Sequence, residues 1–247
     1  WAASLRVSLD PTGFTPKMTE HTIKQYSIEL EDLRSKVLRM GGLVETQITK
    51  ALEGLQNGNL NTLDEVIEGD RKVNILQIEL DNDCNQIVAK RQPAAMDLRL
   101  VMSVIRSAAD LERIGDEAKK IAKSAKRLHA DDFAFVPRVD LAHSSQLAIS
   151  MLHTALDAFA RSDGSNYASI RARDAEVDAS FKAVTRQLIT YMMEDPRTIS
   201  RSLEVLFIAK AIERIGDHAK NVAEYVVFMA EGEDVRYAKA QAQAAES

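Results

Sequence analysis

A segment of eleven residues that occurs twice constrains this chain more than any other feature of its sequence. Residues 112–122 (ERIGDEAKKIA) return as residues 213–223 (ERIGDHAKNVA), with eight of the eleven positions identical and an offset of 101 residues. A repeat of this length indicates one folded unit that is used twice. Because both copies contain a Glu-x-x-x-Asp pair, the sequence also predicts a site that is present twice.

The composition is that of a globular and helix-rich protein. The chain has 247 residues, of which 45% are hydrophobic and 28% charged, and this is enough to bury a sizeable core. Aromatic residues make up only 5%, a mixture that favours long helices over sheets. The net charge of −5 argues against a nucleic-acid partner, which would need a basic face.

Cysteine usage and hydropathy indicate a compartment. Cys84 is the only cysteine, so no intramolecular disulfide can form, which is typical of the cytoplasm. The sequence contains no run of 18 apolar residues and no leader-like start, so we expect neither a membrane span nor a signal peptide. Residues 1–17 show no helical period and predict a disordered arm or an artificial extension. Residues 237–247 predict a frayed tail.

Prolines and turn residues divide the rest of the chain into helices. Pro93, Pro137 and Pro196 separate long helical stretches, and proline starts a helix or breaks its interior. Gly58-Asn59 and Asp163-Gly164 add two turns. We therefore expect six helices, at residues 20–57, 61–91, 94–129, 138–162, 165–194 and 197–231.

The two halves correspond helix by helix. Asp70-x-x-Val73 matches Asp174-x-x-Val177 at an offset of 104 residues, close to the offset of the eleven-residue repeat. Short loops favour antiparallel neighbours. The sequence thus predicts an all-α fold of two pseudo-symmetric three-helix bundles, at residues 18–131 and 137–236.

Acidic residues stand where apolar residues are expected. At about 100° per residue, Glu112 and Asp116 lie on the shoulder of the apolar stripe of their helix, as do Glu213 and Asp217. Asp70 and Asp174 fall on lines of the preceding helices that are otherwise mostly apolar, and Asp178 follows Asp174 by one turn.

These placements need compensation. Like charges four residues apart destabilise a helix by roughly 0.2–0.5 kcal/mol, and a buried carboxylate costs more unless it is paired or bound to metal. A hard cation would bind such oxygen ligands. The alternative is salt bridging, because Arg113 and Lys120 neighbour Asp116, and Lys210, Arg214 and Lys220 surround the second pair.

Other chemistries lack their motifs. The five histidines never form Glu-x-x-His, the pattern of ferritin-like di-iron proteins, and we expect His218 on the surface. Cys84 lies on an apolar line and predicts a core thiol. The sequence has no Gly-rich phosphate loop, Gly-x-Ser-x-Gly or Cys-x-x-Cys. We therefore expect a protein that is not an enzyme.

Several segments together resemble the PhoU family, from about Met18 to about Arg236. They are MGGLVE at residues 40–45, AKRQP at 89–93, DLRLV at 97–101, LERIGD at 111–116, LDAFAR at 156–161, YMMED at 191–195 and the second repeat at 213–217. The resemblance implies a homodimer of paired three-helix bundles that carry iron, zinc, manganese or magnesium ions.

Residue by residue, the resemblance implies two metal sites. Asp174, Asp178, Glu213 and Asp217 would form one of them. Asp70, Glu112 and Asp116 would form the other, where Asn74 stands in place of an acid and reduces the number of charged ligands.

The resemblance also implies a function. The protein would be a cytoplasmic negative regulator of phosphate uptake and of the phosphate-starvation response, recruited to the inner face of the membrane. Its partners would be a phosphate ABC transporter and a sensor histidine kinase. The residues leave two alternatives open, a carboxylate-bridged metalloenzyme and a metal-free helical scaffold.

Overall fold

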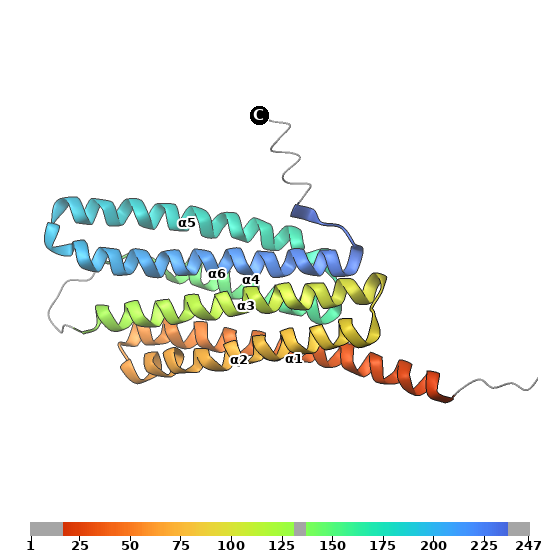
Figure 1. Ribbon diagram of the computed structural model, residues 1–247. Coiled ribbons are helices and arrows are strands. Elements are labelled where there is room, and N and C mark those ends of the chain that lie inside the picture. Colours follow the sequence, from red (N-terminus) through yellow and green to blue (C-terminus); the bar gives the residue numbers. More distant parts are fainter. Residues whose placement is uncertain (1–16, 131–136, 237–247) are drawn as a thin grey trace, which may run out of the picture.

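The computed structural model describes residues 17–130 and 137–236, and within them the chain forms an all-α fold (Figure 1). The expected arm at residues 1–17 and tail at 237–247 lie, apart from residue 17, outside the described residues. The helices are α1 (Lys17–Asn57), α2 (Leu60–Arg91), α3 (Ala95–Leu128), α4 (Ala142–Arg161), α5 (Tyr167–Glu194) and α6 (Ile199–Glu231), with short 3₁₀ turns η1 (Gly164–Asn166) and η2 (Pro196–Thr198).

Local chemistry explains where the helices begin and end. α1 ends before Gly58, whose φ of 66° belongs to the left-handed region that glycine tolerates. The Asn59 side chain then accepts hydrogen bonds from the backbone N–H groups of Asn61 and Thr62 and so caps α2. Asp163 and Asp195 accept from the N–H two residues onward and open η1 and η2.

The expected boundary of the fourth helix was wrong. The sequence predicted a helix over residues 138–162, but α4 begins only at Ala142. The Asp140 carboxylate accepts a hydrogen bond from the Ala142 N–H at 2.9 Å, and this local turn competes with helix in the residues just before Ala142. The expected starts of the last two helices were also early, because those residues form η1 and η2.

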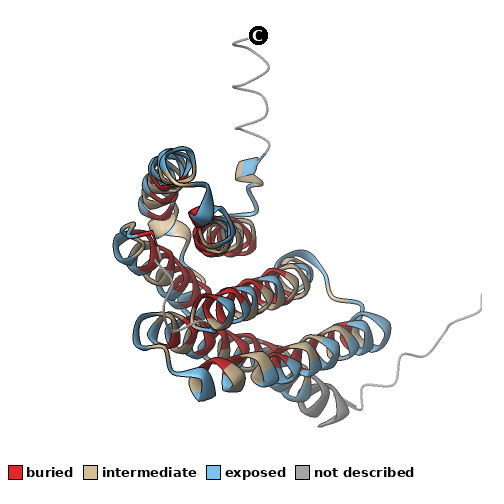
Figure 2. Ribbon diagram, turned by 90° about the vertical axis from the view of Figure 1, so that its left-hand side faces the viewer, coloured by how far each residue is buried: buried red, intermediate tan, exposed pale blue. Residues whose placement is uncertain are grey.

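Two three-helix units lie side by side. α1, α2 and α3 run up, down and up, α4, α5 and α6 repeat this order, and α3 and α6 meet along the centre of the molecule in antiparallel orientation (Figure 1). Viewed along the helices, the buried residues face one another between the helices (Figure 2). The apolar line expected on α3 is buried throughout, as is Cys84, whose thiol pKa burial raises to about 12. The predicted fold class is confirmed.

Two glycines lie where neighbouring helices pack, and a Cβ at either position would be in ordinary van der Waals contact with a valine. A Cβ on Gly115 of α3 would lie 3.5 Å from Cγ1 of Val73 on α2, and one on Gly216 of α6 would lie 3.6 Å from Cγ1 of Val177 on α5. These valines follow Asp70 and Asp174 by three residues. Each aspartate shares a helix face with its valine, and this face packs against the acidic repeat.

Candidate metal centres and the α3–α6 network

A lysine bridges two acids in the first half. The ammonium of Lys119 on α3 donates a hydrogen bond to Asp70 Oδ2 on α2 at 2.7 Å and lies 3.8 Å from Asp116 Oδ1 on its own helix. The Asp70 side chain is 5% exposed and that of Asp116 is 43% exposed. Lys119 thus neutralises a carboxylate that would otherwise be buried alone.

The second half repeats this arrangement. The ammonium of Lys220 on α6 donates to Asp174 on α5 and, at 2.9 Å, to Asp217 Oδ1. Burial alone would lower the pKa of Lys220, but the bonds to the two aspartates outweigh burial and raise it. Lys119 and Lys220 are equivalent positions of the repeat, so the duplicated unit is an acid–lysine–acid group.

The pKa directions of two predicted acids reflect both burial and repulsion by the other acids. The pKa of Glu112 is raised by burial first and then by the negative charges of Asp116 and Asp70. The pKa of Asp174 is raised by burial, against the opposing effect of Lys220, and Asp217 and Asp178 raise it further. In each half, two of the predicted acids therefore act electrostatically on a third.

Glu213 is the exception among the seven predicted residues. Its carboxylate is held by the Lys210 ammonium at 2.6 Å, one turn earlier on α6. Within residues 17–130 and 137–236, no group of three or more His, Cys, Asp or Glu side chains is arranged to hold a metal ion. The lysine ammonium groups take the place between the acids that such an ion would need.

The chemistry of the donors nevertheless fits a hard cation. In the first half, Asp70 Oδ1 and Asn74 Oδ1 are buried side-chain oxygens that receive no hydrogen bond from the described residues. They belong to residues one helical turn apart and hence on one face of α2. Carboxylate and amide oxygens are the ligands that hard cations prefer. An ion could thus be held by Asp70, Asn74, Glu112 and Asp116 if Lys119 moved aside.

A second polar network joins the two halves. Asp110 on α3 is 1% exposed and accepts hydrogen bonds from Tyr225 Oη at 2.8 Å and Asn221 Nδ2 at 3.3 Å, and its Oδ1 lies 2.7 Å from His218 Nδ1. Burial would raise the pKa of Asp110, but these three bonds together lower it. The network fixes the register of α3 against α6.

The sequence analysis did not predict two residues of these sites, Lys119 and Asp110, and it placed a third, His218, wrongly on the surface. Lys119 was detectable, because it follows Asp116 by three residues as Lys220 follows Asp217. Asp110 gave no signal, since the equivalent position of the second half is Ala211. His218 was expected on the surface, but its side chain is only 18% exposed because it packs onto Asp110.

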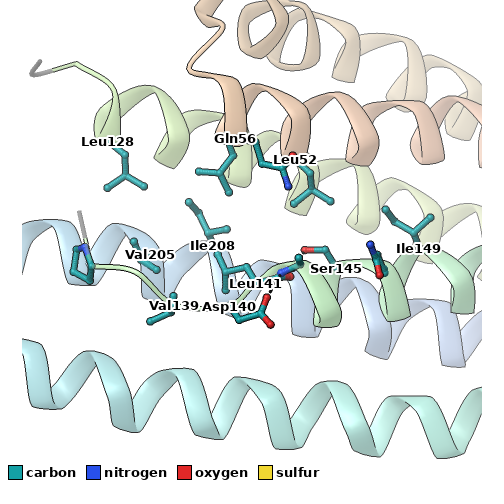
Figure 3. A pocket seen from close by; sticks show the side chains of 14 residues that line it. Leu52, Gln56, Leu128, Val139, Asp140, Leu141, Ser145, Ile149, Val205 and Ile208 are labelled. Carbon is teal, nitrogen blue, oxygen red and sulfur yellow. Dashed lines mark hydrogen bonds between the residues drawn. The ribbon is translucent and has the colours of Figure 1, made fainter. Parts of the chain in front are cut away.

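A cavity of about 390 Å³ lies elsewhere, where the two halves meet beside the ends of α1 and α3 (Figure 3). Leu52 and Leu128 of the first half face Leu141, Val205 and Ile208 of the second across it. Among its described lining residues Asp140 is the one carboxylate, and it already accepts a hydrogen bond from the Ala142 N–H. The cavity therefore offers neither the acids nor the charge of the duplicated sites.

Over the described residues, fold and sites define a class of all-α protein made of two three-helix units that each carry an acid–lysine–acid group. Within the described ranges, none of the helices combines the length and the apolar character needed to cross a membrane.

Comparison with known proteins identifies the family. The PhoU domain matches residues 37–125 and 141–226. The "Phosphate-specific transport system accessory protein PhoU homolog" of Pseudomonas aeruginosa is 44% identical over 220 residues, which cover 89% of this chain and 91% of that protein. The corresponding protein of Escherichia coli is 42% identical with the same coverage. This chain belongs to the PhoU family.

Solved structures agree with this assignment. A crystal structure of PhoU from Pseudomonas aeruginosa covers 84% of this chain and 100% of its own, with a TM-score of 0.81 and 44% identity. The phosphate transport system regulatory protein PhoU from Streptococcus pneumoniae, 28% identical, covers 84% of this chain and 98% of its own with a TM-score of 0.75.

The repulsion around Glu112 leads to a stability prediction. Its pKa is raised in the folded state, so the penalty develops as the pH rises through the carboxyl range and is complete at neutral pH. We expect Glu112→Gln to stabilise the metal-free protein at pH 7 by roughly 0.2–0.5 kcal/mol, the cost of a like-charged pair four residues apart. Urea denaturation in the presence of a chelator measures this.

The matched control is Glu68→Gln, an exposed acid on α2. Its free energy of unfolding should not change, and the gain of Glu112→Gln should shrink as the pH falls toward 4. A loss of stability in Glu112→Gln at pH 7 would contradict the repulsion.

Proposed function

We propose that this protein is an accessory regulator of phosphate-specific transport. It limits phosphate uptake and holds the phosphate-starvation response off when phosphate is plentiful. The observation that carries the proposal is the match to PhoU accessory proteins over 91% of their length, because it includes both three-helix units and both acidic repeats.

The protein acts as a cytoplasmic adaptor rather than as an enzyme. It docks, as a homodimer, on the cytoplasmic side of a phosphate ABC transporter and on a membrane sensor histidine kinase. The chemistry of the duplicated sites supports this role, because each pairs carboxylates with a lysine ammonium that is held as a cation by its acids. A cationic lysine is not a nucleophile or a general base.

We also propose that iron, zinc, manganese or magnesium binds at the acidic repeats. Asp70, Glu112 and Asp116, with the amide oxygen of Asn74, hold the ion of the first half. Asp174, Asp178 and Asp217 hold that of the second half, which Glu213 joins after it leaves Lys210. A bound ion supplies a fixed positive charge that braces α2 to α3 and α5 to α6.

The metal-free scaffold is a second candidate, and one observation favours it. Lys119 and Lys220 already form ion pairs with Asp70, Asp116, Asp174 and Asp217, four of the acids that a cation would bind. In that case the acid–lysine–acid groups act as structural ion pairs alone.

The regulatory role is tested in a bacterial host from which its own family member has been deleted. In medium rich in phosphate, the deletion should raise both the uptake of radiolabelled phosphate and a reporter driven by a phosphate-starvation promoter. Expression of this chain should return both toward the level of the intact host. If both stay high while immunoblots show normal amounts of the protein, the regulatory proposal fails.

Metal binding is tested by elemental analysis after equilibrium dialysis against Mn²⁺, Zn²⁺ or Fe²⁺. Asp217→Asn should lose about half of the metal bound by the unsubstituted protein, because one of two sites is disabled. The control Glu176→Gln, an exposed acid on the same unit, should keep all of it. No retained metal in the unsubstituted protein, or equal metal in both variants, would favour the scaffold.

A further inference from the structure

A basic groove runs between the second half of α3 and the first half of α6, away from the acid–lysine–acid groups. It encloses about 260 Å³. Its floor includes the buried residues Glu117, Ser124 and Ala211. Its walls are formed by the exposed side chains of Lys120, Lys123 and Arg127 from α3 and of Phe207, Lys210 and Arg214 from α6.

The acids around this basic groove balance its cations only in part. Glu117 lies 2.8 Å from the Lys120 ammonium and 3.1 Å from the Arg214 guanidinium. Arg127 pairs with Glu204, and Lys210 pairs with Glu213. Among the described residues, no acid forms an ion pair with Lys123. The groove therefore keeps a positive excess in a chain whose net charge is −5.

An exposed apolar stripe leads into the basic groove. Ile199, Leu203 and Phe207 follow one another at four-residue intervals on α6 and are 41%, 38% and 55% exposed. Residues at this spacing share one helix face. Three exposed apolar side chains on one helix face, next to the charged side chains of the groove, form a candidate interaction surface.

The internal repeat provides a comparison within the molecule. At the offset of 101 residues, Arg106 stands where Phe207 stands, and Glu224 and Phe228 replace Lys123 and Arg127. In that half the Arg106 guanidinium lies over the rings of Tyr225 and Phe228, at 5.8 and 5.6 Å from their centroids. The α3–α6 pair thus carries two different sites. At one end Arg106 covers the rings of Tyr225 and Phe228, and at the other end the basic groove is open. The fold alone does not require the groove.

We propose that the basic groove and the stripe of Ile199, Leu203 and Phe207 dock an acidic amphipathic helix of a partner protein. Its apolar face lies along the stripe with one side chain against Phe207, and its carboxylates meet Lys123 and the neighbouring cations. This deepens the adaptor role and rests on it, since an adaptor needs such a surface. A small anion would use the cations but would leave the three apolar residues exposed to water.

Fluorescence polarisation with the full chain tests the proposal. The probe is a fluorescein-labelled 18-residue helical peptide with leucines three and four residues apart and glutamates at most other positions. One reference peptide has serine for each leucine, and another has lysine for each glutamate. We expect the acidic amphipathic probe to bind at least tenfold more tightly than either reference, with an affinity that falls as salt rises.

Matched variants locate the binding site. Phe207→Ala and Lys123→Glu should each weaken the probe at least tenfold, because one removes the apolar anchor and the other the uncompensated cation. Ile78→Ala and Lys72→Glu, an exposed apolar residue and an exposed cation on α2, should change the dissociation constant less than twofold. Circular dichroism confirms that all four variants fold.

Several results would overturn the proposal. One is equal binding of the acidic probe and its serine reference, and another is unchanged binding to Phe207→Ala and Lys123→Glu. Displacement of the probe by millimolar inorganic phosphate at constant ionic strength would make the groove an anion site. If sedimentation shows that Phe207→Ala dissociates an oligomer of the unsubstituted protein, the surface joins two copies of this chain instead.

The test separates this inference from the proposed function. If the acidic peptide does not bind but the chain still restores low phosphate uptake, the proposed docking surface is wrong and the proposed regulatory function is retained. If the probe binds as expected but uptake stays high, the surface exists and the regulatory proposal fails.

Discussion

The placement of one positive charge between two carboxylates on neighbouring helices underlies much of this structure. Lys119 joins Asp70 to Asp116, and Lys220 joins Asp174 to Asp217. Without a cation, Asp70 and Asp174 would each leave a buried charge unpaired, which costs more than the loss of an exposed ion pair. This requirement links α2 to α3 and α5 to α6, and in this structure a lysine satisfies it in each half.

Both halves of the duplicated chain keep the acid–lysine–acid group, but they differ in the residues along the seam between α3 and α6. Val73 and Val177 pack against Gly115 and Gly216, and both halves bring an aspartate to the acidic repeat. Along the antiparallel α3–α6 seam the halves diverge. One end carries the buried network of Asp110, and the other carries an open groove with uncompensated positive charge. The acid–lysine–acid groups connect the helices within each unit, whereas the divergent α3–α6 seam gives the two ends of the molecule different surfaces.

Periodicity was enough to predict the fold, because helix positions and the repeat are local properties of the sequence. Asp70 and Asp174 were placed correctly on buried lines for the same reason. Lys119, the ion-pair partner of Asp70, was not predicted because it lies on a different helix. The salt-bridge alternative named Lys120 as the lysine near Asp116 instead. The contact between Asp110 and His218 could not be foreseen, because it depends on the register of α3 against α6, which no repeated motif encodes. The late start of α4 coincides with a local turn in which the Asp140 carboxylate accepts a hydrogen bond from the Ala142 N–H, and helical periodicity does not reveal such a turn.

The most direct test of the central claim is calorimetric titration of Lys220→Met with Mn²⁺, together with urea denaturation of the metal-free protein. If one cation must sit between Asp174 and Asp217, the variant loses about 3 kcal/mol of stability without metal, as expected when one partner of a buried pair is removed. It then binds Mn²⁺ at least tenfold more tightly than the unsubstituted protein, and the metal restores the stability. Unchanged stability without metal, or Mn²⁺ binding no tighter than that of the unsubstituted protein, would contradict the account.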